Sequence, residues 1–306
     1  MAWVLGVDEN GLGPRLGPLV ATAVALELPK ARRRAVDRAA EGARIADSKL
    51  VSGFGKMAWA EGVALAAVER QEGRAPRDAD ELLSALALDG ALALRAPCPT
   101  ASAPQCWSEP IELPAYGGSL EEGHRALEAL AKAGARLVRA RSAIACVRVY
   151  DEGVARRGSK VALDLELFER LILDARAASD EDLDATCGMV GGIRQYLRYF
   201  SRFDPVATRL VEESRARARY RVPGVGLVTF EVDADASHPA VALASMIGKY
   251  VRELGMDRIT RFYRRAQPEL APVSGYHDPK TAAFVEATTR TRRRLRIADG
   301  CFERGS

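Results

Sequence analysis

The chain has 306 residues, of which 48% are hydrophobic and 28% charged, and its formal net charge is +4. These values exclude a disordered chain and fit one large domain or two small ones. The mild excess of basic residues is compatible with a polyanionic partner without diagnosing one.

The cysteines and the apolar segments bear on where the protein works. The five cysteines are widely spaced and form no C-x-x-C pair, which argues against a zinc site and a disulfide framework. They indicate reduced thiols in a cytoplasmic protein. The first residues, MAWVLGVDENG, lack the regions of a signal peptide, and no apolar run of about 18 residues could span a membrane.

The N-terminal part of the chain begins with two predicted strands. Residues 3–8 form a short apolar run before the glycine-rich turn at Gly11 and Gly13. Residues 19–28 form a second apolar run that could pair back on the first. The helices predicted next are residues 30–41, 54–69 and 79–94, with a polar break at Asp47-Ser48-Lys49.

Residues 96–118 are rich in Pro, Ser and Gly and show no period, so we expect an irregular insertion there. The pattern then predicts, in order, a helix, a strand, a helix and a strand, at residues 120–133, 136–149, 161–178 and 182–190.

The remaining elements complete a mixed pattern. Residues 193–216 look helical with a break at Pro205, and residues 219–235 predict a hairpin. A long helix follows Pro239, and an arginine-rich helix is predicted at 281–296. Strands mixed with helices predict an α/β or α+β protein whose sheet is covered by helices.

Two acidic residues end the first predicted strand. A carboxylate on the face of a buried strand is costly unless it is paired or binds a metal, and Asp8 falls in that position. Glu9 follows at once and would point to the opposite face if the strand continued. Both could serve one site if the strand ends there and the chain turns. The alternative is that Asp8 and Glu9 only meet solvent.

A second acidic group lies at Glu231, Asp233 and Asp235. A spacing of two would place all three on one face of a strand. Pro239 then suits the first turn of a helix, so Asp235 is expected at a strand end before a helix N-terminus, where phosphate is attracted. A solvated acidic edge is the alternative.

Several motifs together resemble the ribonuclease HII family. The segment from Gly6 to Pro18 looks like its D-E-A-G-R-G-P-x-x-G-P opening, and Asp47-Ser48-Lys49 like its D-S-K. Weaker or later matches are Gly158-Ser159-Lys160, Ala234-Asp235 with Pro239, Ala244 to Lys249, and Gly275-Tyr276.

The resemblance implies a ribonuclease H-like mixed sheet flanked by helices, an α/β fold with a C-terminal helical part. We expect a catalytic domain over residues 1–260, with the 96–118 insertion, and a helical extension over 261–306. The family cleaves the RNA strand of RNA/DNA hybrids, or cuts at ribonucleotides in duplex DNA, with two Mg²⁺ or Mn²⁺ ions held by four carboxylates.

The resemblance also implies roles for residues of this chain. It assigns catalysis and metal binding to Asp8, Glu9 and Asp235. It assigns substrate binding to Gly11, Gly13, Lys49, Lys249 and Tyr276.

Three departures from the family pattern affect these expectations. Gly188 stands where the third carboxylate belongs, and Asp184, four strand residues or about 13 Å away, cannot simply replace it. Leu12 replaces the arginine of the G-R-G triplet, which weakens the expected recognition of the ribose 2′-OH. Glu253 replaces an aspartate and could instead form a surface pair with Lys249.

Three function classes therefore stay open. One is an active metal-dependent endoribonuclease. Another is a weak or inactive relative that binds nucleic acid or a protein partner. The third is a metal-dependent nuclease on other structured nucleic acids, because Leu12 weakens the ribose argument. The run Arg290, Arg292, Arg293, Arg294 and Arg296 suits backbone phosphates, or is a solvated helix face.

Overall fold

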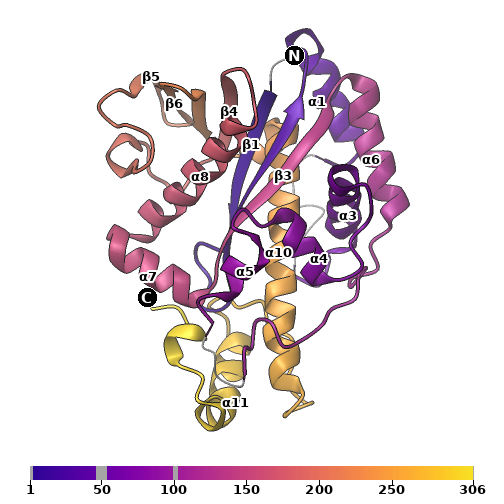
Figure 1. Ribbon diagram of the computed structural model, residues 1–306, viewed down its shortest axis with the longest axis vertical. Coiled ribbons are helices and arrows are strands. Elements are labelled where there is room, and N and C mark those ends of the chain that lie inside the picture. Colours follow the sequence, from indigo (N-terminus) through magenta and orange to yellow (C-terminus); the bar gives the residue numbers. More distant parts are fainter. Residues whose placement is uncertain (1–2, 46–53, 99–102, 306) are drawn as a thin grey trace.

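The computed structural model describes residues 3–45, 54–98 and 103–305. A seven-stranded sheet in the order β3-β2-β1-β4-β7-β6-β5 runs through the molecule, with helices on both faces (Figure 1). The strands are β1 (Trp3–Asn10), β2 (Leu19–Glu27), β3 (Arg136–Ala145), β4 (Leu183–Gly188), β5 (Arg209–Glu213), β6 (Arg217–Val222) and β7 (Gly226–Glu231). The predicted α/β class and the flanked mixed sheet are confirmed.

The pairing of β1 differs along its two edges. It is antiparallel to β2 over its full length, from Trp3↔Glu27 to Asn10↔Val20. Its parallel pairing with β4 ends earlier, at Val7↔Cys187. The strand therefore loses one neighbour where its acidic residues begin, and this opens a gap in the sheet beyond the end of β4.

Both faces of the sheet are buried. Val20 and Val24 on β2 belong to a core formed with the long helix α10, while Leu19 and Ala21 belong to a core formed with α8. The helices are α1 (Arg33–Gly42), α3 (Ala58–Glu72), α4 (Ala79–Leu86), α5 (Gly90–Arg95), α6 (Leu120–Ala133), α7 (Val147–Arg157), α8 (Lys160–Ala177), α9 (Ala234–Ser237), α10 (Pro239–Arg264) and α11 (Pro279–Leu295). No described helix is long and apolar enough to cross a membrane.

Gly6 allows α10 to lie directly on β1. A Cβ atom at this position would lie 2.1 Å from the carbonyl carbon of Ala240, a distance that side chains do not tolerate. Glycine at residue 6 therefore fixes the close approach of the two elements. The following turns of α10 reach the same side of β1 as Asp8.

The C-terminal part packs on the end of α10. Tyr263, Phe284 and Phe302 form a third apolar cluster with Leu16 from the loop after β1. Helix α10 runs through residue 260, the expected domain boundary, so the division into two units stays a prediction.

The described residues of the 96–118 segment are irregular, as expected, and a buried carboxylate holds part of them. Glu61 of α3 is fully buried and accepts hydrogen bonds from the backbone N–H groups of Ala115, Tyr116 and Gly118. The hydroxyl of Tyr250 on α10 donates to it over 2.9 Å. Near the insertion, four free cysteines line a cavity of about 30 Å³, a grouping that their spacing does not indicate: Cys98, Cys106, Cys146 and Cys301.

Several predicted elements were wrong in extent or type. The helix predicted at 79–94 is two helices, because Ala87 after α4 has an extended backbone and forms a bridge with Ser142. The strand predicted at 136–149 ends at Ala145, opposite the first residue of β2, and α7 follows.

The helix predicted at 193–216 is an irregular loop followed by β5. Tyr196, Phe200 and Phe203 have helical spacing, but they fill the core, and Tyr196 stacks on Phe230 with ring centroids 3.9 Å apart.

Candidate functional site

A pocket of about 590 Å³ opens where the gap beside β1 meets α9 and α10. Seven of the expected site residues line it: Asp8, Glu9, Gly11, Gly13, Asp235, Lys249 and Tyr276. Lys49, with the rest of the D-S-K motif, lies outside the described residues. The pocket therefore unites residues that are up to 268 positions apart, counted from Asp8 to Tyr276.

Asp8 lies on the face of the sheet covered by α10. Burial and, to a smaller extent, the nearby charge of Asp235 raise the pKa of its carboxyl to about 7. A hydrogen bond from Ser245 and the positive charge of Lys249 act in the opposite direction. Ser245 and Lys249, both on α10, thus partly offset the energetic cost of burying the Asp8 carboxylate.

Glu9 lies on the opposite face, toward α8. The prediction that the strand ends at Asp8 was wrong, because β1 continues to Asn10 against β2. Both carboxylates still reach the pocket because β4 ends beside them. Burial, and then the charges of Asp164 and Asp8, raise the pKa of Glu9 well above its usual value.

Gly188 is the point where the two carboxylates approach each other across the gap. A Cβ atom on Gly188 would lie 2.4 Å from Oδ1 of Asp8 and 3.8 Å from Oε2 of Glu9. A carboxylate at residue 188 would thus stand beside both, and this chain has none there.

Other acidic residues of the neighbouring segments do not supply a carboxylate at residue 188. Asp182 is exposed and pairs with Arg221 at 3.8 Å, and Glu212 lies 3.9 Å from Arg217. Asp184 is opposite Val4 in the sheet, and four residues of strand separate it from residue 188, about 13 Å.

The second acidic group does not share a strand face, so that prediction was wrong. Strand β7 ends at Glu231, Asp233 has a left-handed backbone with φ +48°, and Asp235 lies in the short helix α9. The turn sends Glu231 away from the pocket, to Arg217 at 2.9 Å and His238 at 3.4 Å. Asp233 and Asp235 remain at the pocket.

Asp164 on α8 is an acidic residue that the sequence analysis missed. Its side chain is fully buried, and burial followed by the charge of Asp8 raises its pKa well above the usual value. Ser159 of the weak G-S-K match begins α8 by accepting a hydrogen bond from the N–H of Ala162. The sequence signal that could have identified Asp164 is its position on the apolar face of an amphipathic helix, five residues after the cap at Ser159.

The glycine turn after β1 is held by the C-terminal segment. Gly11 has a φ of +95°, and its carbonyl accepts a hydrogen bond of 2.5 Å from the guanidinium of Arg304. The same guanidinium donates to the carbonyl of Gly17 over 2.8 Å and lies over the ring of Tyr150. Arg15 forms an ion pair with Glu303, the residue before Arg304, so Arg15 also contacts the C-terminal segment.

Tyr276 presents an exposed ring at the pocket. Its ring lies 4.9 Å from the guanidinium of Arg252, which is buried and donates to the carbonyl of Ser274. Glu253 lies 3.2 Å from the same guanidinium and is buried, so the surface-pair alternative for Glu253 was wrong.

The donor chemistry of the pocket fits a divalent cation. Carboxylate oxygens are the ligands that Mg²⁺ and Mn²⁺ prefer, and a cation would offset the repulsion among Asp8, Glu9 and Asp235. Both oxygens of the buried Asp164 carboxylate lack a hydrogen-bond partner. In the described part of the chain, no three His, Cys, Asp or Glu side chains are already arranged around a metal position, so these side chains would have to rotate toward a cation.

Comparison with known proteins agrees with the motifs. A family model described as Ribonuclease HII matches residues 202–298, which confirms the predicted resemblance. No curated protein matches the sequence.

Among solved structures, the chain is similar to ribonuclease HII from Archaeoglobus fulgidus, solved in complex with PCNA, at 17% identity and a TM-score of 0.49 over 97% of this chain and 92% of that one. It is also similar to ribonuclease H2 from Pyrococcus horikoshii, at 16% identity and a TM-score of 0.47 over 98% and 92%. A third is Bst-RNase HIII in complex with Mn²⁺, at 15% identity and a TM-score of 0.45 over 94% and 71%.

Proposed function

Since residues 202–298 match ribonuclease HII, a family of ribonuclease H-type nucleases, we propose that this protein is a metal-dependent endonuclease. Its substrate would be the RNA strand of an RNA/DNA hybrid, or a ribonucleotide within duplex DNA. The observation that carries the proposal is the meeting of Asp8, Glu9 and Asp235 in one pocket, although they come from a strand and a helix far apart in sequence.

The described residues fit distinct tasks at a phosphodiester. Asp8, Glu9 and Asp235 would hold Mg²⁺ or Mn²⁺, which would supply Lewis-acid activation of a water and stabilisation of the leaving oxygen. Lys249 places a positive charge beside Asp8, where a phosphate would approach. The exposed ring of Tyr276 could stack on a sugar at the rim of the pocket.

The glycine turn supports recognition of the ribose. Gly13 lies at the pocket, and a Cβ atom there would meet nothing within 4 Å, so its backbone is open to a ligand. The carbonyl of Gly11 is already taken by Arg304. Ribose recognition would therefore use backbone N–H groups and Gly13 rather than the Gly11 carbonyl.

One observation favours the other candidate function, in which the protein binds nucleic acid but cleaves it weakly or not at all. Gly188 supplies no carboxylate beside Asp8 and Glu9, so the pocket lacks one of the four groups that the family pattern contains. A protein that binds hybrid duplexes with weak or absent cleavage would account for this change.

Cleavage assays separate the two functions. Purified protein is incubated with a labelled RNA/DNA hybrid, or with a duplex that carries one ribonucleotide, in Mg²⁺ or Mn²⁺. We expect cleavage that Asp8→Asn reduces by at least about 100-fold and that Asp182→Asn, a change at an exposed residue, leaves unaltered. Folded wild-type protein that binds the hybrid without cutting it would contradict the enzyme and support the binding function.

A further inference from the structure

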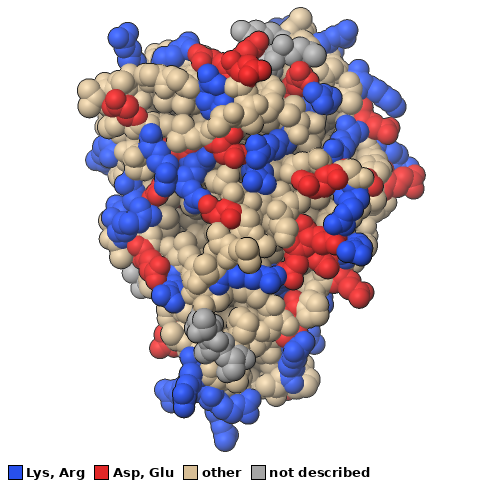
Figure 2. Space-filling model, viewed as in Figure 1, with Lys and Arg blue, Asp and Glu red and all other residues tan. Residues whose placement is uncertain are grey.

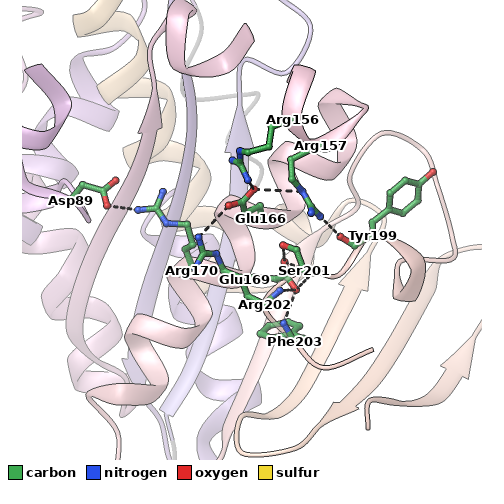
Figure 3. A network of polar contacts seen from close by, with 10 residues as sticks. All are labelled: Asp89, Arg156, Arg157, Glu166, Glu169, Arg170, Tyr199, Ser201, Arg202 and Phe203. Carbon is green, nitrogen blue, oxygen red and sulfur yellow. Dashed lines mark hydrogen bonds and ion pairs between the residues drawn. The ribbon is translucent and has the colours of Figure 1, made fainter. Parts of the chain in front are cut away.

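Helix α8 carries four acidic side chains, and three of them have obvious partners. Glu166 lies near Arg156, Arg157 and Arg202, at 3.0, 3.5 and 3.2 Å (Figure 3). Glu169 accepts hydrogen bonds from the backbone N–H groups of residues 201–203 and from the Ser201 hydroxyl. Asp174 lies 3.5 Å from Arg139.

Asp164 is the exception on this helix. It is fully buried, and neither of its carboxylate oxygens has a hydrogen-bond partner. The nearest positive charge acting on it is that of Arg304, whose guanidinium donates to the carbonyls of Gly11 and Gly17 instead. A buried polar group without a partner destabilises the fold, and more so when it is charged.

Glu61 shows what a structural buried carboxylate looks like in the same molecule. It is equally buried, yet its two oxygens accept three backbone N–H groups and one tyrosine hydroxyl. The fold thus satisfies a buried acid where the acid has a structural role. The unmet oxygens of Asp164 therefore require another explanation.

Asp164 is close enough to the carboxylates of the pocket for its charge to interact with theirs. Its charge is the largest acting on Glu9, and the charge of Asp8 acts on Asp164. The gap that these groups share lies beyond the end of β4, where Gly188 contributes no side chain. A missing carboxylate on β4 thus coincides with an extra, unpartnered carboxylate on α8.

We propose that Asp164 replaces the absent carboxylate at residue 188 and binds a divalent cation together with Asp8 and Glu9. The proposal rests on the proposed metal-dependent function but concerns cation binding alone. A cation between these groups would neutralise like charges that are otherwise buried close together. The carboxylate that completes the site would then come from a helix on one face of the sheet and not from the end of a strand.

Mn²⁺ binding tests the proposal without any cleavage assay. The affinity of the full-length protein for Mn²⁺ is measured by titration calorimetry, and bound ions are counted by electron paramagnetic resonance. Asp164→Asn is expected to weaken Mn²⁺ binding by about 10-fold or more, the loss that follows from changing even an outer partner of a metal site. Asp174→Asn, on the same helix but paired with Arg139, is the matched control and should bind as wild type does.

Thermal unfolding distinguishes a metal-binding role of Asp164 from a purely structural one, because the two roles predict different unfolding temperatures for the variant. Without metal, Asp164→Asn should unfold at the same or a higher temperature, because it removes a buried like charge. With saturating Mn²⁺, the increase in unfolding temperature should be smaller than in wild type. If Asp164 were only structural, the variant would lose stability without metal and keep the full Mn²⁺ effect.

A second variant covers the case in which Asp164→Asn folds poorly. Adding Gly188→Asp to Asp164→Asn should restore Mn²⁺ affinity, because it returns a carboxylate beside Asp8 and Glu9. Unchanged Mn²⁺ affinity in folded Asp164→Asn would overturn the proposal, and so would a folded double variant that stays weak. If the wild-type protein binds Mn²⁺ through Asp164 but cuts no substrate, the proposed nuclease function is wrong and the proposed role of Asp164 in cation binding is supported.

Discussion

At the scale of single residues, the site consists of buried carboxylates that destabilise the fold. Burial alone raises the pKa of Asp8, Glu9 and Asp164, and each of them is also affected by the charge of another member. Ser245 and Lys249 relieve part of this cost at Asp8. Such an arrangement is typical of a functional site rather than of a stability device.

The raised pKa of Asp8 predicts how the metal-free protein responds to pH. The folded carboxyl has a pKa of about 7, against an ordinary pKa of 3.8 for aspartate, so the folded state keeps a proton that the unfolded chain loses. Its contribution to stability is complete below about pH 4 and is lost as the pH rises to about 7. The free energy of unfolding in chelator should fall more steeply over this range in wild type than in Asp8→Asn.

Denaturant titrations at several pH values measure this difference. Asp182→Asn, at an exposed residue, serves as the control and should follow the wild-type curve. Parallel curves for wild type and Asp8→Asn would mean that Asp8 titrates normally and is not held in a costly environment.

At the scale of elements, the glycine turn depends on the far end of the chain. Arg304 is buried, and burial lowers its pKa to about 10 while its guanidinium holds the carbonyls of Gly11 and Gly17. The backbone N–H of Arg304 also donates to the carbonyl of Arg15, and that of Gly305 to the carboxylate of Asp151. The last residues therefore set the shape of one wall of the pocket.

Removing this clamp should cost stability. Arg304→Ala leaves two carbonyls without their donor, and hydrogen bonds to a charged group contribute about 1.5–3 kcal/mol each, so we expect a loss of about 3 kcal/mol or more in the free energy of unfolding. Urea unfolding measures the loss. Arg290→Ala, at an exposed position of α11, should change stability by less than about 0.5 kcal/mol, and an equal effect of both substitutions would refute the clamp.

The elements also show how far the sequence could be interpreted. The helix at 120–133 and the strand beginning at Leu19 were predicted to within a residue or so, because their apolar periods are regular and their ends carry caps and turns. The loop with Tyr196, Phe200 and Phe203 was misassigned because its helical spacing reflects packing against β6 and β7. Such spacing cannot distinguish a helix from a loop pressed on a sheet.

The candidate site was predictable only where a motif marked it. Asp8, Glu9 and Asp235 follow from the resemblance, and the pocket brings them together. The position of Asp164 depends on how α8 packs beneath Glu9, a tertiary contact that no local pattern specifies. The role of Arg304 likewise depends on the return of the chain end to its beginning.

At the scale of the whole molecule, charge is distributed rather than concentrated. Figure 2 shows acidic and basic side chains interspersed over one face, with a basic group at the narrow end, over α11 and the end of α10. The arginine run is not one surface, because Arg292 is buried and donates to Val285 and Thr288. Helix α11 begins three residues after Tyr276, and its exposed Arg290 lies about 17 Å along the helix from that start.

The central claim is that the gap beyond β4 is a cation site lined by carboxylates from both faces of the sheet. The most direct measurement is anomalous X-ray diffraction from crystals of the full-length protein grown with Mn²⁺. We predict at least one Mn²⁺ peak with Asp8, Glu9 and Asp164 among its ligands. Well-ordered crystals in saturating Mn²⁺ with no peak in this gap, or with a peak that Asp164 does not contact, would contradict the account.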